Sequence, residues 1–357
     1  MISPGARPGA PGTNRHATAA GDTPGSPAAA EPRPHPHGEP GERRRVARPM
    51  AVVALGGNAF REDGDASLAA QRRVVTAAAA RLPAVLRAGY RLLVTHGNGP
   101  QVGAELQKNE CAPPEHLPLP LELCVAETQG SLGYLLESAL ARVLAREPRC
   151  AGVAALVTRV RVTGDDPSFA SPTKFVGPFY SETQIHQLAR ERGWKVAPAG
   201  ERGWRRVVPS PEPVEVLNAP ALRALLTNRF AVVAGGGGGV PVVEREGSLE
   251  GVDAVVDKDL TAALIARAIG AELLVILSDV DAVYLDHGRP SRRRLGRVPA
   301  DEMRRHQAEG HFPAGSMGPK VEAALRFAEA TGHTARIGDI RSLEAVLRGE
   351  AGTAVVP

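Results

Sequence analysis

The stretch AVVALGGN, residues 51–58, joins an apolar run of five residues to a glycine turn. Similar apolar runs occupy residues 91–95, 153–158, 231–234 and 273–277. We interpret each run as a strand, because short apolar runs bounded by turn residues are typical of buried strands.

Helix-length segments alternate with these runs. They occupy residues 66–88, 124–146, 181–192, 219–226, 259–269 and 318–331. This alternation predicts an α/β fold with a largely parallel sheet that helices cover on both faces. Residues 159–180 and 202–217 are rich in Pro, Gly, Arg and aromatic residues, and we expect an inserted lobe there rather than sheet.

The composition favours a cytoplasmic globular protein. The 357 residues suffice for a sizeable core, and no apolar run of about 18 residues suggests a membrane span. Three widely spaced cysteines argue against a disulfide framework or a zinc site, and for a reducing cytosol.

Residues 1–49 differ from the rest of the chain. They hold ten prolines and seven glycines but almost no bulky apolar residues, so we expect a disordered leader. A further hypothesis is that Met50 is the true start, which mapping the native N-terminus would test. The whole chain has a formal net charge of +4, and the leader, with seven arginines and four acids, accounts for +3 of it. The remaining 308 residues therefore carry a net charge of only 4 − 3 = +1. Nucleic-acid binding by the folded part is therefore not supported.

Four glycine-bearing turns follow or accompany the predicted elements. They occupy residues 56–58, 96–101, 235–239 and 315–320. Glycines let backbone N–H groups approach an anion closely, and a helix N-terminus adds its dipole. The chain has no Gly-Lys dipeptide and no Gly-x-Gly-x-x-Gly, so a P-loop protein or a standard dinucleotide-binding dehydrogenase is not indicated.

Only five of the 43 basic residues are lysines. Lysine is a compact point charge that suits a transferring phosphoryl group, whereas arginine favours two-point contacts. Lys174 ends the motif SPTK, Lys258 lies between Asp257 and Asp259, and Lys320 closes the fourth glycine turn. These three contexts favour a phosphate site. Lys108 and Lys195 have polar surroundings typical of solvated surface lysines.

Three further residues have two interpretations each. Asp259 either orients a lysine or is a first-turn acid at a helix start. Tyr284, in the run LSDVDAVY after an apolar strand, either packs on a base or lies at the edge of the core. His96 is a candidate base, but a structural histidine explains it better.

Together these motifs resemble the amino acid kinase superfamily and, within it, the carbamate kinases. The resemblance covers residues 51 to 357. SPTK, residues 171–174, and GWRR, residues 203–206, point to the carbamate kinases because they belong to the inserted lobe of that family. The resemblance implies one kinase domain over residues 50–357, with the lobe at about 159–217. It also implies a three-layer α/β/α sandwich around an eight-stranded, mainly parallel sheet, and a homodimer.

The resemblance also implies roles for individual residues. The transferring phosphoryl group would be held by Gly56, Gly57 and Asn58, and the carbamate side would be lined by Gly97, Asn98 and Gly99. Lys174, from the lobe, would reach the phosphoryl group and close over the substrate. Lys258 and Lys320 would neutralise charge on the phosphates, with Asp259 orienting the lysines. The nucleotide would be surrounded by Gly235, Gly236, Gly237, Ser278, Asp279, Val280, Tyr284, Met317 and Gly318. Mg²⁺ would arrive with ATP or ADP, without a dedicated metal site.

The implied reaction is reversible phosphoryl transfer between ATP and carbamate, running toward ATP in arginine catabolism. One alternative is another kinase of the superfamily, acting on an acylated amino acid or a nucleoside monophosphate. A second is a nucleotide-binding sensor without activity. All three lysines and Asp259 being present argues against the sensor.

Overall fold

The computed structural model describes residues 48–56, 67–111, 113, 119–313 and 315–357. The predicted leader lies outside these residues except for its last two. No helix in the described part of the chain has the length and apolar character needed to cross a membrane.

Eight strands form the main sheet, in the order β15-β17-β16-β12-β1-β2-β9-β3. Their bounds in that order are Arg297–Pro299, Thr353–Val356, Ala335–Asp339, Leu273–Ser278, Met50–Leu55, Arg91–His96, Phe230–Val233 and Gly152–Ala155. All neighbours are parallel except β16 and β17. The predicted eight-stranded, mainly parallel sheet is confirmed, and AVVAL forms β1 near its centre.

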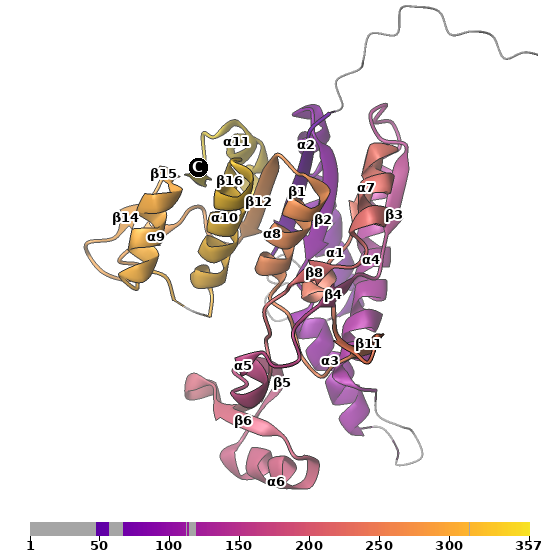
Figure 1. Cartoon of the computed structure of the whole chain (residues 1–357), viewed down its shortest axis with the longest axis vertical. Coiled ribbons are helices and arrows are strands. Elements are labelled where there is room, and N and C mark those ends of the chain that lie inside the picture. The colour runs from indigo at the N-terminus through magenta and orange to yellow at the C-terminus, as the bar shows by residue number, and fades with distance from the viewer. Residues whose placement is uncertain (1–47, 57–66, 112, 114–118, 314) are drawn as a thin grey trace, which may run out of the picture. The chain divides into compact units, whose positions relative to one another are not determined.

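Successive side chains of β1 point to opposite faces of the sheet, and each face is covered by helices. Val52 and Ala54 pack in one apolar cluster, whereas Ala51, Val53 and Leu55 pack in another. The first cluster includes residues of α7 (Ala219–Thr227), α8 (Lys258–Ile269), α9 (Ala300–Ala308) and α10 (Met317–Thr331). The second includes residues of α1 (Leu68–Ala79), α2 (Pro83–Arg87), α4 (Leu121–Leu144) and α11 (Leu343–Arg348). These layers are the expected α/β/α sandwich (Figure 1).

A small lobe lies between β4 (Arg159–Arg161) and β8 (Glu215–Val216) in the sequence. The strands β5 (Lys174–Tyr180), β7 (Trp204–Val208) and β6 (Lys195–Pro198) form its antiparallel sheet. Its helices are α5 (Pro167–Ala170), α6 (Glu182–Arg192) and the short η2 (Gly200–Arg202). Figure 1 shows α6 beside β6 at the lower end of the view. The expectation of a lobe without sheet is wrong, because these three strands pair with one another. Arginines lie over aromatic rings in the lobe, as with Arg206 over Trp194.

Two smaller sheets complete the described part. One has the order β11-β10-β4-β8, with β10 at Val240–Arg245 and β11 at Ser248–Gly251. The other is the hairpin of β13 (Tyr284–Leu285) and β14 (Arg293–Arg294). The remaining helices are α3 (Gly99–Cys111), η3 (Gly236–Gly238) and η4 (Ile340–Ser342). The predicted helix over 66–88 is divided into α1 and α2, since Pro83 begins a new helix.

Candidate active site

The carboxyl ends of β1, β2 and β12 meet at one edge of the main sheet, where open α/β folds bind ligands. The N–H of Gly56 donates to the Leu277 carbonyl at 2.9 Å, and that of Gly97 donates to the Leu55 carbonyl at 3.1 Å. These bonds place Gly56 beside the end of β12 and Gly97 beside the end of β1. Gly57 and Asn58 lie outside the described residues.

Helix α8 begins at this edge with a buried charge cluster. Asp257 caps the helix, because its carboxylate accepts from the backbone N–H of Asp259. The Asp259 side chain is 4% exposed and binds two ammonium groups, Lys258 Nζ at 2.5 Å and Lys320 Nζ at 3.1 Å. Burial raises the pKa of Asp259, but the charges of Lys258 and Lys320 outweigh burial and hold that pKa below its ordinary value. The carboxylate therefore stays ionised.

The third lysine reaches the same helix start from the lobe. Lys174, the first residue of β5, binds Asp257 with 3.0 Å between Nζ and Oδ2. Its side chain is 40% exposed, whereas those of Lys258 and Lys320 are 13% and 15% exposed. The structure thus brings the three predicted lysines onto two carboxylates at the start of α8.

The second and third glycine turns pack against each other. A Cβ added to Gly237 would lie 2.1 Å from Asn98 Nδ2, and one added to Gly236 would lie 2.4 Å from His96 Nε2. Gly237 also has a φ of +63°, so any other residue there would be strained as well as crowded. The buried Asn98 amide donates to the Thr128 hydroxyl at 2.9 Å. Gly236 and Gly237 are therefore needed to let the five-glycine run pack against the 96–98 turn.

His96 is a buried neutral imidazole in this turn. Burial lowers its pKa to about 4, opposed by the Gly97 carbonyl 3.1 Å from Nδ1 and reinforced by the charge of Lys258. At neutral pH the ring carries no charge. This environment fits the structural interpretation of His96, because the ring is only 1% exposed.

A pocket of about 470 Å³ opens beside the lysine cluster. The predicted residues on its wall are Gly56, Ser278, Asp279, Val280, Tyr284, Met317 and Lys320. Other predicted residues lie elsewhere. Gly235 to Gly237 lie against the 96–98 turn, Gly99 begins α3, and the Gly318 N–H donates to the Pro313 carbonyl at 2.9 Å.

Among the pocket residues that the sequence did not indicate, Arg292 and Asp281 contact Tyr284. The Arg292 guanidinium lies over the Tyr284 ring, 3.7 Å from its centroid. Asp281 accepts from the Tyr284 hydroxyl at 2.9 Å. One face of Tyr284 is therefore already covered by a cation. Asp281 lies inside the run LSDVDAVY that suggested the pocket, but no signal in the sequence marked Arg292 among 38 arginines.

The resemblance seen in the motifs extends to whole proteins. The family model described as "Amino acid kinase family" matches residues 49–339. A carbamate kinase of Thermococcus kodakarensis is 42% identical over 309 residues, covering 85% of this chain and 98% of that protein. The carbamate kinase-like protein YahI of Escherichia coli is 44% identical over 312 residues, covering 86% and 98%.

Solved structures give the same result. A carbamate kinase from Giardia lamblia bound to AMP-PNP superimposes with a TM-score of 0.80 at 37% identity, covering 87% of this chain and 99% of that one. A crystal structure from Aeropyrum pernix has a TM-score of 0.82 at 46% identity, covering 86% and 99%. The fold, the motifs and these matches agree that the chain belongs to the amino acid kinase family and is a phosphotransferase.

Proposed function

We propose that this chain is a carbamate kinase, catalysing ADP + carbamoyl phosphate ⇌ ATP + carbamate. Relatives bearing that name match it at about 40% identity or more over most of the chain, and the lobe motifs SPTK and GWRR favour this member of the family. The observation that carries the proposal is the buried Asp259 carboxylate, which holds two ammonium groups at the edge of the nucleotide-sized pocket.

The lysines act by charge rather than by forming a covalent intermediate. Phosphoryl transfer spreads negative charge over the equatorial oxygens, and fixed cations in a site shielded from water stabilise that charge. Asp259 holds Lys258 and Lys320 in position before the substrates bind. By the family resemblance, the 56–58 turn holds the phosphoryl group and the 97–99 turn lines the carbamate side.

Lys174 adds the third positive charge of the site, from the lobe. In the described structure its ammonium group binds Asp257, not the buried carboxylate, and it stays partly exposed. A phosphate arriving between Asp257 and Lys320 would compete for this lysine, and the lobe would then close over the substrate. Its role is to neutralise the phosphoryl group only when substrate is present.

The nucleotide occupies the pocket lined by Ser278, Asp279, Val280 and Met317. The Ser278 hydroxyl and the Asp279 carboxylate, 2.9 Å apart, are the hard oxygen donors that suit Mg²⁺. Mg²⁺ carried by the nucleotide would neutralise part of the phosphate charge. The chain's own contribution is to position the β- and γ-phosphates against Lys320 on the wall of the pocket.

We further propose that the enzyme is a cytoplasmic homodimer that works toward ATP in arginine catabolism. The support is the family resemblance together with the three widely spaced cysteines, which form no disulfide in the structure. Light scattering on the purified protein tests the dimer, and a molecular mass of one chain would contradict it.

A panel of phosphoryl acceptors tests the substrate. Purified protein is given Mg-ATP with carbamate, acetylglutamate or UMP, and ADP formation is followed. We expect ADP only with carbamate. ADP formation with another acceptor would transfer the assignment to another kinase of the family. Nucleotide binding without turnover on any acceptor would favour a sensor.

A further inference from the structure

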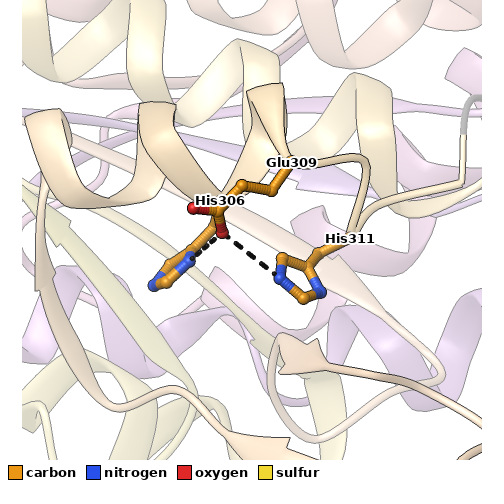
Figure 2. A group of neighbouring side chains, drawn as sticks. All are labelled: His306, Glu309 and His311. Carbon is orange, nitrogen blue, oxygen red and sulfur yellow. Dashed lines mark hydrogen bonds and ion pairs between the residues drawn. The ribbon is translucent and has the colours of Figure 1, made fainter.

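A cluster of imidazole and carboxylate groups lies outside the lysine site. It consists of His306, Glu309 and His311, in the pattern His-x-x-Glu-x-His at the end of α9. Among the described residues, this is the group of histidines and acids whose ligand atoms lie within 4.8 Å of one another. Figure 2 shows the Glu309 carboxylate between the two rings.

The backbone fixes this arrangement. Helix α9 ends in a turn in which Gly310 adopts a φ of +80° and the His311 N–H donates back to the His306 carbonyl at 3.3 Å. This closure of a helix end by a left-handed glycine brings residues five apart side by side. The two rings are consequently held with their centroids 5.7 Å apart.

Each inner nitrogen lies at the spacing of metal ligands from one Glu309 oxygen. His306 Nδ1 lies 3.3 Å and His311 Nε2 lies 3.4 Å from the same oxygen, Glu309 Oε2. A tetrahedral ion with bonds of about 2.0–2.1 Å to nitrogen and oxygen sets its ligands about 3.3 Å apart. Imidazole and carboxylate are donors that suit Zn²⁺ and its neighbours, whereas Mg²⁺ prefers oxygen alone.

The outer nitrogens each face a second carboxylate. His306 Nε2 lies 3.4 Å from Glu302 Oε1, and His311 Nδ1 lies 3.4 Å from Asp286 Oδ1. Ligating histidines commonly direct their other N–H to a carboxylate, which fixes the tautomer and leaves the inner lone pair for the metal. Without a metal, His306 Nδ1 donates to Glu309 Oε2 at 3.3 Å, because an ionised carboxylate can only accept. A dication bound to the two inner nitrogens takes the place of that proton, and the outer nitrogens then carry the N–H groups.

We propose that His306, Glu309 and His311 bind one transition-metal dication of the Zn²⁺ class, with Glu302 and Asp286 as outer-shell carboxylates. The ion would join the end of α9 to the segment that leads into α10 and to the turn after β13. His311 and Phe312 of this segment line the nucleotide pocket. Metal binding would therefore stiffen one wall of that pocket without taking part in phosphoryl transfer.

Binding is measured on the chelator-treated full chain, without nucleotide, because nucleotides bind metal ions themselves. The background carries Cys111→Ser, since Cys111 is an exposed free thiol that would bind zinc unspecifically. Titration with ZnCl₂ followed by calorimetry should give one ion per chain and a higher Tm. CoCl₂ should give the visible absorption of a nitrogen- and oxygen-ligated ion, and MgCl₂ should give none of these effects.

Variants separate the site from adventitious binding. His306→Ala should abolish binding of one equivalent, and Glu302→Gln should weaken it by about tenfold through the outer shell. His186→Ala is the matched control, because His186 also pairs with a glutamate one helical turn away and should leave binding unchanged. Circular dichroism confirms that each variant is folded. Absence of one-to-one binding by the parent, or undiminished binding by folded His306→Ala, would overturn the proposal.

Discussion

The lysines contributed by the main domain and the lysine contributed by the lobe differ in the burial of their side chains and of the carboxylates that they bind. Lys258 and Lys320 share a carboxylate that is 4% exposed, and both belong to or begin helices of the main domain. Lys174 belongs to the lobe, binds the cap residue Asp257 and keeps 40% of its side chain exposed. Two of the three positive charges are therefore held by a buried carboxylate, whereas the third is bound at a partly exposed position. Catalysis by preorganised charge requires the first kind, and closure over a substrate requires the second.

Removing a fixed charge should have the largest effect. We expect Lys258→Ala to lower kcat by about a thousandfold with little change in nucleotide affinity, because the charge acts chiefly on the transition state. Steady-state kinetics and nucleotide titration measure the two quantities. Lys108→Ala, at an exposed lysine, should change neither. Equal losses of rate and affinity for Lys258→Ala would contradict the role.

Removing the buried carboxylate should affect the fold as well. Asp259→Asn leaves two ammonium groups without their ionic partner, and we expect the free energy of unfolding to fall by about 3 kcal/mol. Denaturant unfolding measures the loss. Asp301→Asn, which removes an exposed ion pair with Arg305, should cost less than about 1 kcal/mol. Similar losses in both variants would show that Asp259 does not fix the lysines.

Removing the charge of the lobe should spare stability. We expect Lys174→Ala to lower kcat by about a hundredfold and to change the free energy of unfolding by less than about 1 kcal/mol. Kinetics and denaturant unfolding on the same preparation give both numbers. A stability loss as large as that of Asp259→Asn would mean that Lys174 is part of the fixed framework, and the contrast between the main-domain lysines and the lobe lysine would disappear.

The buried, neutral His96 should make the stability of the fold depend on pH. Its pKa is about 4 in the folded protein, below the ordinary 6.5, so between these values the unfolded chain binds more protons. Stability from this residue is full above pH 6.5 and is lost as the pH falls toward 4, at up to about 1.4 kcal/mol per pH unit. His96→Gln should flatten the pH dependence of unfolding in this window. An unchanged slope would show that His96 is protonated in the fold.

Much of the main sheet was predictable from the sequence, because buried parallel strands appear in a sequence as uninterrupted apolar runs. The runs at 51–55, 91–95 and 273–277 became β1, β2 and β12 within a residue or so. The lobe strands were missed, since KFVGPFY alternates irregularly and gains its packing from arginines over aromatic rings. Contacts between an arginine and an aromatic ring are tertiary contacts, and no local sequence pattern predicts them.

The candidate site divides in the same way. The rarity of lysine and the DKD motif identified residues that the structure brings to one helix start. The position of Gly235 to Gly237 was not predictable. A run of five glycines indicates that another segment packs closely against it, but does not indicate which segment. In the structure that segment is the 96–98 turn. The contact of Arg292 with the Tyr284 ring depends on the pairing of β13 with β14, and no sequence pattern indicated it.

The most direct test is ATP formation from ADP and carbamoyl phosphate by the purified chain, with Lys258→Ala and Lys108→Ala measured beside it. The wild-type chain and Lys108→Ala should form ATP at the same rate, and Lys258→Ala should be slower by about a thousandfold. No ATP from the folded, nucleotide-binding wild-type chain, or an undiminished rate for Lys258→Ala, would contradict phosphoryl transfer by these fixed charges.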